Sequence, residues 1–182
     1  MNIDFKTIEK KDNDYNKAMK LYKTAFLRNE RESLFFLNHK AKNNDIFLKA
    51  IYSYNTQIGI IYYKVYNDIL FILFFAFEKK YQSKGYGSKV LSKLKETYIN
   101  KKIILEIEEV DEKFENYNER ERRLKFYLKN DFKLSNIKVN ISNDSYNIMF
   151  YKNDISYDEI KAFYNSYYGI FKLFSRLKIY KI

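Results

Sequence analysis

Apolar residues recur along this chain with two periods, one typical of half-buried strands and one typical of amphipathic helices. Seven segments alternate or are continuously apolar and are predicted to be strands: residues 2–8, 46–53, 57–65, 69–77, 103–107, 132–141 and 146–151. Four segments have apolar residues spaced three and four apart and are predicted to be helices: residues 15–26, 32–41, 85–99 and 118–130. The predicted order is strand, two helices, three strands, helix, strand, helix and two strands.

The strand predicted over Ile69–Phe77 is apolar on both faces, which is the pattern of a central strand covered on each side. A helix over 85–99 and a buried strand over 103–107 follow it, which predicts a right-handed β-α-β crossover. We therefore predict an α/β (α+β) fold with a mixed central sheet flanked by helices. It is expected to form a single domain over residues 1–182, with its core over 1–152.

The C-terminal stretch over 155–182 has apolar residues at helical spacing, and we predict an extra amphipathic helix there. Its apolar stripe consists of Ile160, Phe163, Tyr164, Tyr167, Ile170, Phe171, Phe174 and Leu177. We favour packing of this helix on the protein's own sheet over a contact between two copies in a homodimer. Binding of its basic residues to an anionic membrane surface is the third alternative.

Composition excludes several classes of protein. The chain of 182 residues has no cysteine and a single histidine, His39, which excludes disulfides, thiolate nucleophiles and a structural zinc site, so we expect no metal. The longest apolar run, Ile69–Phe77, is far shorter than the ~20 residues that span a bilayer. No basic segment or cleavage site follows Met1, so the sequence predicts a cytoplasmic protein without a membrane partner.

The charge of the chain is +11, which raises nucleic acid as a partner. The distribution of charge argues against it, because the segment from Glu106 to Glu121 holds eight acids and two bases. The abundance of Lys, Asn, Ile and Tyr, with no Pro or Trp, is also typical of an AT-rich coding sequence. We therefore consider nucleic acid a weaker candidate partner, and the acidic segment either attracts a cation or forms a solvated loop.

The strongest local motif lies between the central strand and the helix over 85–99. It holds two of the four glycines, in Tyr81-Gln82-Ser83-Lys84-Gly85-Tyr86-Gly87-Ser88. A glycine-rich turn at a helix N-terminus exposes backbone N–H groups and the positive end of the helix dipole, which together bind anions such as phosphate. Val90 stands where a dinucleotide-binding G-x-G-x-x-G motif would have its third glycine, and no G-x-x-x-x-G-K-[ST] is present.

Two segments resemble the GNAT superfamily of acetyl-CoA-dependent N-acetyltransferases. The stretch 75–88 is similar to the family's motif A, whose core is Q/R-x-x-G-x-G/A, and 123–132 is similar to A-x-x-F-Y-x-x-x-G-F. Arg123 and Asp131 depart from the small residue and the glycine of the second signature. With the order of elements, the resemblance covers about residues 1–152.

The resemblance implies that acetyl-CoA is the co-substrate. It assigns the pyrophosphate to the backbone amides of the turn, which comprises Gln82, Ser83, Lys84, Gly85, Tyr86, Gly87 and Ser88. It assigns the pantetheine arm to the main chain of Phe75 and Phe77. Lys84 either adds a charge beside the phosphates or is an ordinary surface lysine.

The resemblance also implies an acid and a base for acetyl transfer. Leu105-Glu106-Ile107 is similar to the Leu-Glu-Val of ribosomal-protein N-terminal acetyltransferases, in which the glutamate is the base. Glu106 is therefore the candidate base, acting directly or through a water, with Glu108 as the alternative on the same face of the strand. Tyr127 matches the tyrosine that protonates the leaving CoA thiolate.

The sequence thus predicts an acyltransferase that moves an acetyl group to a primary amine, which is a small polyamine-like or antibiotic-like molecule or a peptide N-terminus. Two alternatives remain open. One is a GNAT enzyme that acetylates aminoacyl-tRNA, and the other is a non-catalytic acetyl-CoA-binding or scaffold protein. A charged-tRNA substrate requires a basic track near the acceptor site, and the acidic segment argues against one.

Overall fold

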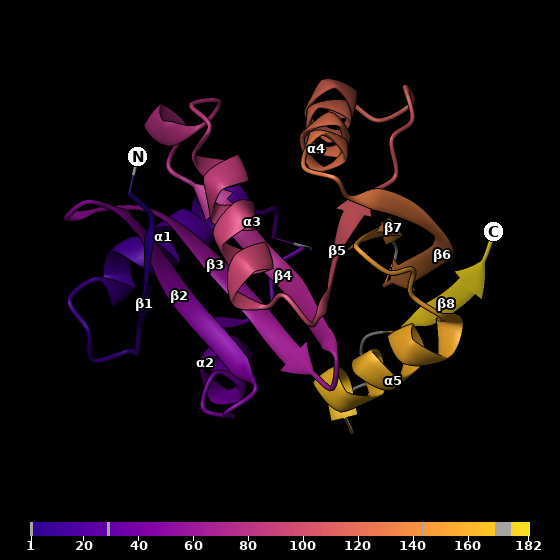
Figure 1. Cartoon of the computed structure of the whole chain (residues 1–182), viewed down its shortest axis with the longest axis horizontal. Helices are drawn as coiled ribbons and strands as arrows, with labels where there is room; N and C mark the ends of the chain where they lie inside the picture. Colours follow the sequence, from indigo (N-terminus) through magenta and orange to yellow (C-terminus); the bar gives the residue numbers. More distant parts are fainter. Residues whose placement is uncertain (1, 29, 143, 170–175) are drawn as a thin grey trace. The chain divides into compact units, whose positions relative to one another are not determined.

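The computed structural model describes residues 2–28, 30–142, 144–169 and 176–182, and within them the predicted order of elements is confirmed (Figure 1). The elements are β1 (Asp4–Thr7), α1 (Tyr15–Ala25), α2 (Leu34–Lys40), β2 (Ile46–Ser53), β3 (Thr56–Tyr66), β4 (Ile69–Phe77), the 3-10 turn η1 (Lys79–Tyr81), α3 (Tyr86–Thr97), β5 (Lys102–Glu108), α4 (Tyr117–Lys129), β6 (Lys133–Ile141), β7 (Asp144–Tyr151), α5 (Tyr157–Tyr168) and β8 (Lys178–Lys181).

The strands are hydrogen-bonded to one another in the order β1-β2-β3-β4-β5-β7-β6-β8. The predicted mixed α+β sheet with flanking helices is confirmed. The chain divides into two compact units, one formed by residues 1–65 and 72–99 and the other by residues 66–71 and 100–182. β4 belongs to both, because its first three residues group with the second unit.

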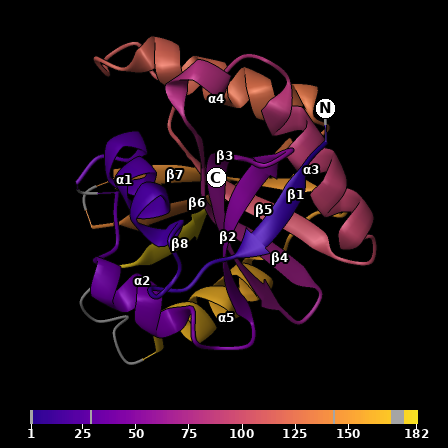
Figure 2. The same ribbon diagram turned by 90° about the vertical axis from the view of Figure 1, so that its left-hand side faces the viewer.

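The first unit has helices on both faces of β3. Tyr62 and Phe74 lie on the face covered by α1, where the ring of Tyr22 meets that of Phe74 at 4.9 Å. The next residue, Tyr63, points to the opposite face and exchanges a 2.9 Å hydrogen bond with Tyr98, which caps α3. Figure 2 shows this arrangement, with α1 and α2 on one side of β2–β4 and α3 on the other.

The second unit is built on antiparallel pairs. β7 pairs with β5 on one side and with β6 on the other, so the last two predicted strands, 132–141 and 146–151, form an antiparallel pair. α5 packs its aromatic side chains on the first residues of β4, and the ring of Phe163 stacks on that of Phe71 at 4.2 Å. The predicted packing of the C-terminal helix on the protein's own strands is therefore confirmed for α5.

The C-terminal helix is shorter than predicted. α5 ends at Tyr168, and Gly169 follows with a φ of +52°. Lys178–Lys181 forms strand β8, antiparallel to β6, in place of the predicted last helical turn. The helical spacing of apolar residues continues across Gly169 in the sequence, but the conformation of Gly169 ends the helix. Of the predicted stripe, Ile170, Phe171 and Phe174 lie outside the described residues.

Helix α4 is also less buried than its apolar residues predict. None of its residues is buried, and Leu128, which was expected on the apolar side with Leu124 and Tyr127, is 47% exposed. The charged residues of α4 outnumber the apolar ones, so the helix remains at the surface beside β5.

Candidate active site

The predicted site residues form two groups, one in each unit. The seven residues of the turn, with Phe75 and Phe77, belong to the first unit, whereas Glu106, Glu108 and Tyr127 belong to the second.

The turn before α3 contains two residues in the left-handed region. Ser83 has a φ of +57° and Gly85 a φ of +83°, and α3 begins directly afterwards at Tyr86. A left-handed residue followed by a helical one directs successive amide N–H groups toward one side of the chain. Glycine adopts this conformation without the strain that a Cβ causes, which explains why Gly85 stands at this position.

The N-terminus of α3 has the features of an anion site. No side chain caps it, and its first turn contains no acidic residue. The first hydrogen bond within the helix runs from Lys89 N to Gly85 O, so the N–H groups of Tyr86, Gly87 and Ser88 have no acceptor within the helix. These N–H groups and the helix dipole can hold a phosphate group.

The turn is tied to the end of β4. The side-chain amide of Gln82 donates a 3.1 Å hydrogen bond to the carbonyl oxygen of Phe77. This carbonyl, which the resemblance assigns to the pantetheine arm, still has a second lone pair with which to accept another bond. The rings of Phe75 and Phe77 lie on one face of β4, 5.1 Å apart, and both side chains are half-buried.

Gly59 of β3 contributes to the position of β4, and the sequence analysis missed it. A Cβ on Gly59 would lie 2.6 Å from the carbonyl oxygen of Ala76 and 2.9 Å from the ring of Phe77. Glycine therefore allows the backbone of β3 to approach the end of β4 closely. A single glycine within a strand pattern is the only sequence signal for this contact.

Replacing Gly85 by alanine is expected to weaken acetyl-CoA binding about tenfold, because the left-handed conformation costs a non-glycine residue roughly 1–2 kcal/mol. The added Cβ meets no atom within 4 Å, so the effect comes from the backbone alone. Isothermal titration calorimetry measures it. Gly169→Ala is the matched control, since Gly169 also has a positive φ and open space around it. Equal affinity in both variants would contradict a role for Gly85 in binding.

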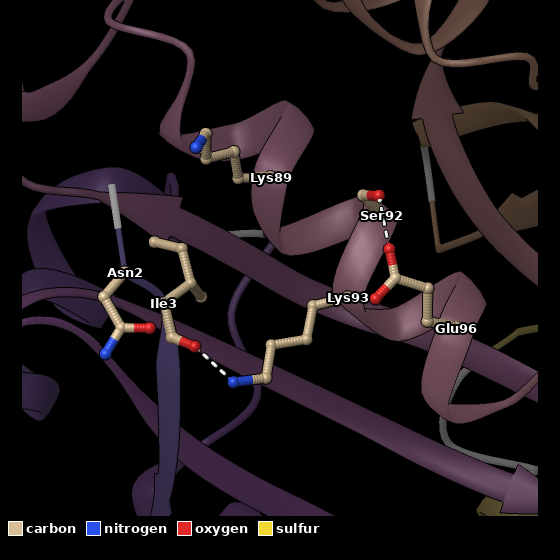
Figure 3. Close-up of a pocket in the computed structure, with 6 residues that line it drawn as sticks. All are labelled: Asn2, Ile3, Lys89, Ser92, Lys93 and Glu96. Atoms are coloured by element: carbon tan, nitrogen blue, oxygen red, sulfur yellow. Dashed lines mark hydrogen bonds between the residues drawn. The ribbon is translucent and has the colours of Figure 1, made fainter.

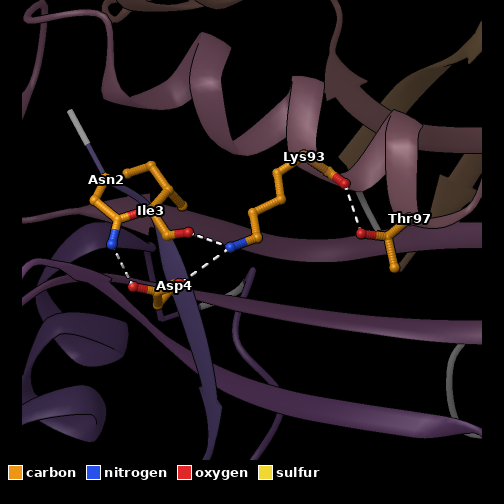
Figure 4. Close-up of polar contacts among 5 residues, drawn as sticks. All are labelled: Asn2, Ile3, Asp4, Lys93 and Thr97. Atoms are coloured by element: carbon orange, nitrogen blue, oxygen red, sulfur yellow. Dashed lines mark hydrogen bonds and ion pairs between the residues drawn. The ribbon is translucent and has the colours of Figure 1, made fainter.

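Figure 3 shows a hollow of about 440 Å³ on the first unit, further along α3. Its lining comprises Asn2, Ile3, Lys89, Ser92, Lys93 and Glu96. Lys93 is already engaged there, because its ammonium group donates to the Ile3 carbonyl and lies 3.2 Å from Asp4 (Figure 4). None of the predicted site residues lines this hollow.

In the second unit, β5 places Glu106 and Glu108 on the same face, opposite Ile148 and Tyr146 of β7. Glu108 is buried, with 8% of its surface exposed, and forms an ion pair with Arg123 of α4. Arg123 stands where the family signature has a small residue, and this pairing gives the departure a physical reason.

Glu106 has a different neighbour. Its side chain is half-buried, and its carboxylate accepts a hydrogen bond from the hydroxyl of Tyr164 on α5. Burial, and then the charge of Glu106, raises the pKa of Tyr164 well above its ordinary value, so this hydroxyl stays protonated and remains a donor. Tyr164 belongs to the predicted apolar stripe, and its spacing gave no sign of a polar contact.

Tyr127 lies one helical turn after Arg123 on α4, on the same face. The side chain of Tyr127 is half-buried, and the loss of water around its hydroxyl raises the pKa of that group above the ordinary value. The Arg123 guanidinium opposes this shift, and the Glu108 carboxylate adds to it. The hydroxyl is therefore protonated at neutral pH, as a general acid must be.

The end of α4 fixes the backbone of Tyr127. The N–H of Phe132 donates to Tyr127 O and the N–H of Asp131 donates to Leu128 O, both at 3.1 Å, which is the Schellman pattern. The rings of Tyr127 and Phe132 are 5.7 Å apart, which supplies the apolar contact of that motif. Asp131 has a φ of +64°, so it holds a left-handed conformation where the signature has glycine.

Replacing Asp131 by glycine is expected to raise the free energy of unfolding by about 1 kcal/mol, since glycine adopts the left-handed conformation without steric cost. For a chain of this length the midpoint of thermal unfolding should rise by roughly 2–4 °C. Differential scanning calorimetry measures both quantities. Asp131→Ala keeps the steric cost and should not gain stability, and an equal gain in both variants would contradict the explanation.

Comparison with known proteins places these features in one family. The model of the acetyltransferase (GNAT) family matches residues 12–132. A GNAT-family acetyltransferase from Bacteroides thetaiotaomicron has a similar structure, with a TM-score of 0.76, 21% identity, and coverage of 92% of this chain and 97% of the other. A sequence search of curated proteins finds no match.

Two further structures are similar at lower identity. The ribosomal-protein-S18-alanine N-acetyltransferase of Escherichia coli gives a TM-score of 0.62 at 13% identity, covering 85% of this chain and 96% of that one. An aminoglycoside 6′-N-acetyltransferase complexed with coenzyme A gives 0.64 at 14% identity, covering 85% and 100%. At these identities the likeness establishes the fold.

Outside residues 1, 29, 143 and 170–175, no helix is long and apolar enough to cross a membrane. Within the same part of the chain, no three His, Asp or Glu side chains gather as they would around a metal ion.

Proposed function

The chain belongs to the GNAT family of acetyltransferases, and we propose that it transfers the acetyl group of acetyl-CoA to a primary amine. The observation that carries this proposal is the uncapped N-terminus of α3, preceded by the left-handed Gly85 and joined to the end of β4 through Gln82. The amides of Gln82–Ser88 would hold the pyrophosphate, and the main chain of Phe75 and Phe77 would hold the pantetheine arm.

Acetyl-CoA supplies an acyl group activated as a thioester. Since the chain has no cysteine, we propose that the acceptor amine attacks the thioester carbon directly. The C–N bond forms and the C–S bond breaks without a thiol-linked acyl-enzyme. An ammonium group loses one proton before it can attack and a second one as the amide forms. The leaving sulfur gains one proton, so one proton is released overall.

We assign the first of these protons to Glu106. A lysine-like amine with a pKa of ~10.4 needs roughly 4.6 kcal/mol to reach its neutral form at pH 7, whereas an α-amino group with a pKa of ~7.8 needs only about 1. A base therefore accelerates the reaction of the first kind of amine much more. Glu106 is preferred over Glu108 because the latter is paired with Arg123.

We assign the proton that the sulfur gains to Tyr127. The leaving thiolate is a strong enough base to take a proton from a phenol positioned near it. A protonated hydroxyl on a half-buried side chain, at a helix end fixed by a Schellman motif, fits this role.

The acidic segment after β5 supports an amine as the acceptor. Some of its carboxylates are paired, as Glu109 is with Lys138 at 2.9 Å. Three others, Glu112, Glu115 and Glu119, have exposed side chains. Exposed carboxylates attract an ammonium group and repel the phosphates of a tRNA, so we prefer a small polyamine-like or antibiotic-like molecule or a peptide N-terminus.

The proposal is tested by incubating the protein and acetyl-CoA with a panel of polyamines, aminoglycosides, peptides and aminoacyl-tRNAs, and measuring release of free thiol. We expect release above the no-acceptor control for at least one primary amine. Release with charged tRNA alone would favour the tRNA-directed alternative. Release equal to the control across the panel, with acetyl-CoA bound, would indicate a non-catalytic binding protein.

A further inference from the structure

The C-terminal helix α5 lies beyond the residues that match the family model, yet it contacts the proposed base. The hydroxyl of Tyr164 donates a hydrogen bond to the carboxylate of Glu106, 58 residues away in the sequence. Within the second unit, α5 therefore supplies a polar group to the strand that holds the proposed catalytic carboxylate.

Several contacts fix α5 and the ring of Tyr164. Ser156 and Glu159 form a capping box at the start of the helix, and Lys102, the first residue of β5, pairs with Glu159. Tyr164 itself is 1% exposed, and its ring lies against that of Phe71 at 5.9 Å. The donor therefore has little freedom to leave the carboxylate.

We propose that Tyr164 is a positioning residue for Glu106, which makes the C-terminal helix a part of the active site. This inference depends on the proposed function, in which Glu106 takes the proton of the amine. A hydroxyl that donates to a carboxylate fixes its orientation and favours its ionised form. Because a carboxylate has about four acceptor positions, the bond leaves Glu106 able to accept a proton.

Other charged or titratable groups surround this pair. Glu108 lies two residues along β5 and is neutralised by Arg123 of α4. Tyr146 of β7 and Tyr168 of α5 interact electrostatically with Tyr164, and the ring of Tyr168 stacks on that of Tyr164 at 6.0 Å. None of these groups is removed when the Tyr164 hydroxyl alone is deleted, so that change isolates one hydrogen bond.

Tyr164→Phe keeps the packed ring and removes the donor. Loss of the donor disfavours the charged carboxylate, so the pKa of Glu106 should rise by about 1–2 units. The acid limb of the pH profile of kcat/KM should then move to higher pH by the same amount. The KM for acetyl-CoA should stay unchanged, because the turn before α3 is untouched.

The direct readout is NMR titration of the side-chain carboxyl of Glu106, assigned by its loss in Glu106→Gln. Tyr167→Phe is the matched control, since it removes a hydroxyl from a buried tyrosine of the same helix and should leave the pKa of Glu106 unchanged. Site-specific 3,5-difluorotyrosine at position 164 keeps the hydroxyl and makes it a stronger donor. It should lower the pKa of Glu106, and it tests the bond even if Tyr164→Phe does not fold.

The inference is overturned if the pKa of Glu106 is the same in the wild type and in the Tyr164 variants. It is also overturned if that pKa shifts while the pH profile of kcat/KM does not. Failure of the proposed function would look different, because the NMR titration would show the shift in a protein that releases no thiol with any amine.

Discussion

Replacing Tyr127 by phenylalanine is expected to lower kcat by about 10²–10⁴-fold, the usual contribution of a general acid. The affinity for acetyl-CoA should remain at the wild-type value, because the proposed cofactor site, the turn before α3, does not include this hydroxyl. Steady-state thiol release and calorimetric titration separate the two quantities. Tyr117→Phe, at the first turn of the same helix, is the matched control and should keep wild-type turnover.

The pH dependence of turnover follows from the direction in which the pKa of Tyr127 is shifted. In the proposed mechanism Tyr127 acts in its protonated form. Desolvation raises its pKa, so deprotonation of Tyr127 should not limit the rate until strongly alkaline pH. Wild-type turnover by Tyr127→Phe with an active acceptor would contradict the assignment of the acid.

Replacing Glu106 by glutamine is expected to lower kcat/KM by about 10²–10⁴-fold for an amine with a pKa near ~10.4, and by much less for an α-amino group near ~7.8. The reason is that the second amine reaches its neutral form without help at neutral pH. In the variant the rate with the first amine should rise about tenfold for each pH unit up to the pKa of the amine. Rates measured with both amines between neutral and alkaline pH give this pattern.

Glu108→Gln is the matched control for this experiment. It removes a charge from the same face of β5 but breaks the pair with Arg123, so we expect lower thermal stability and a small change in kcat. A larger loss of turnover in Glu108→Gln than in Glu106→Gln would reverse the assignment of the base.

Much of the fold and of the cofactor turn was predictable from local patterns. These patterns depend only on residues close in sequence. They are the continuous apolar run of β4, the helical spacing of Val90, Leu91 and Leu94, and the two glycines that lie between β4 and Val90. Periodicity reports which face of an element is buried, and the glycine-rich turn marks a place where the backbone becomes left-handed, as it does at Gly85.

The surroundings of the proposed acid and base were less predictable, because their contacts join residues far apart in the chain. Nothing in the stripe of α5 distinguishes Tyr164, which meets Glu106, from Tyr167, the other buried tyrosine of that helix. Arg123 departs from the signature, and its pairing with Glu108, 15 residues away in the sequence, explains the departure. The sequence pattern does not predict β8, because the helical spacing of apolar residues continues by chance across Gly169.

Calorimetric titration of the full chain with acetyl-CoA and with acetyl-pantetheine, which lacks the pyrophosphate, tests the role of the turn before α3 most directly. We predict saturable binding of acetyl-CoA at one site and binding of acetyl-pantetheine that is at least roughly tenfold weaker, because only the first ligand offers phosphate oxygens to the amides of α3. No heat with acetyl-CoA, or equal affinity for both ligands, would contradict the proposal that the turn before α3 binds the pyrophosphate.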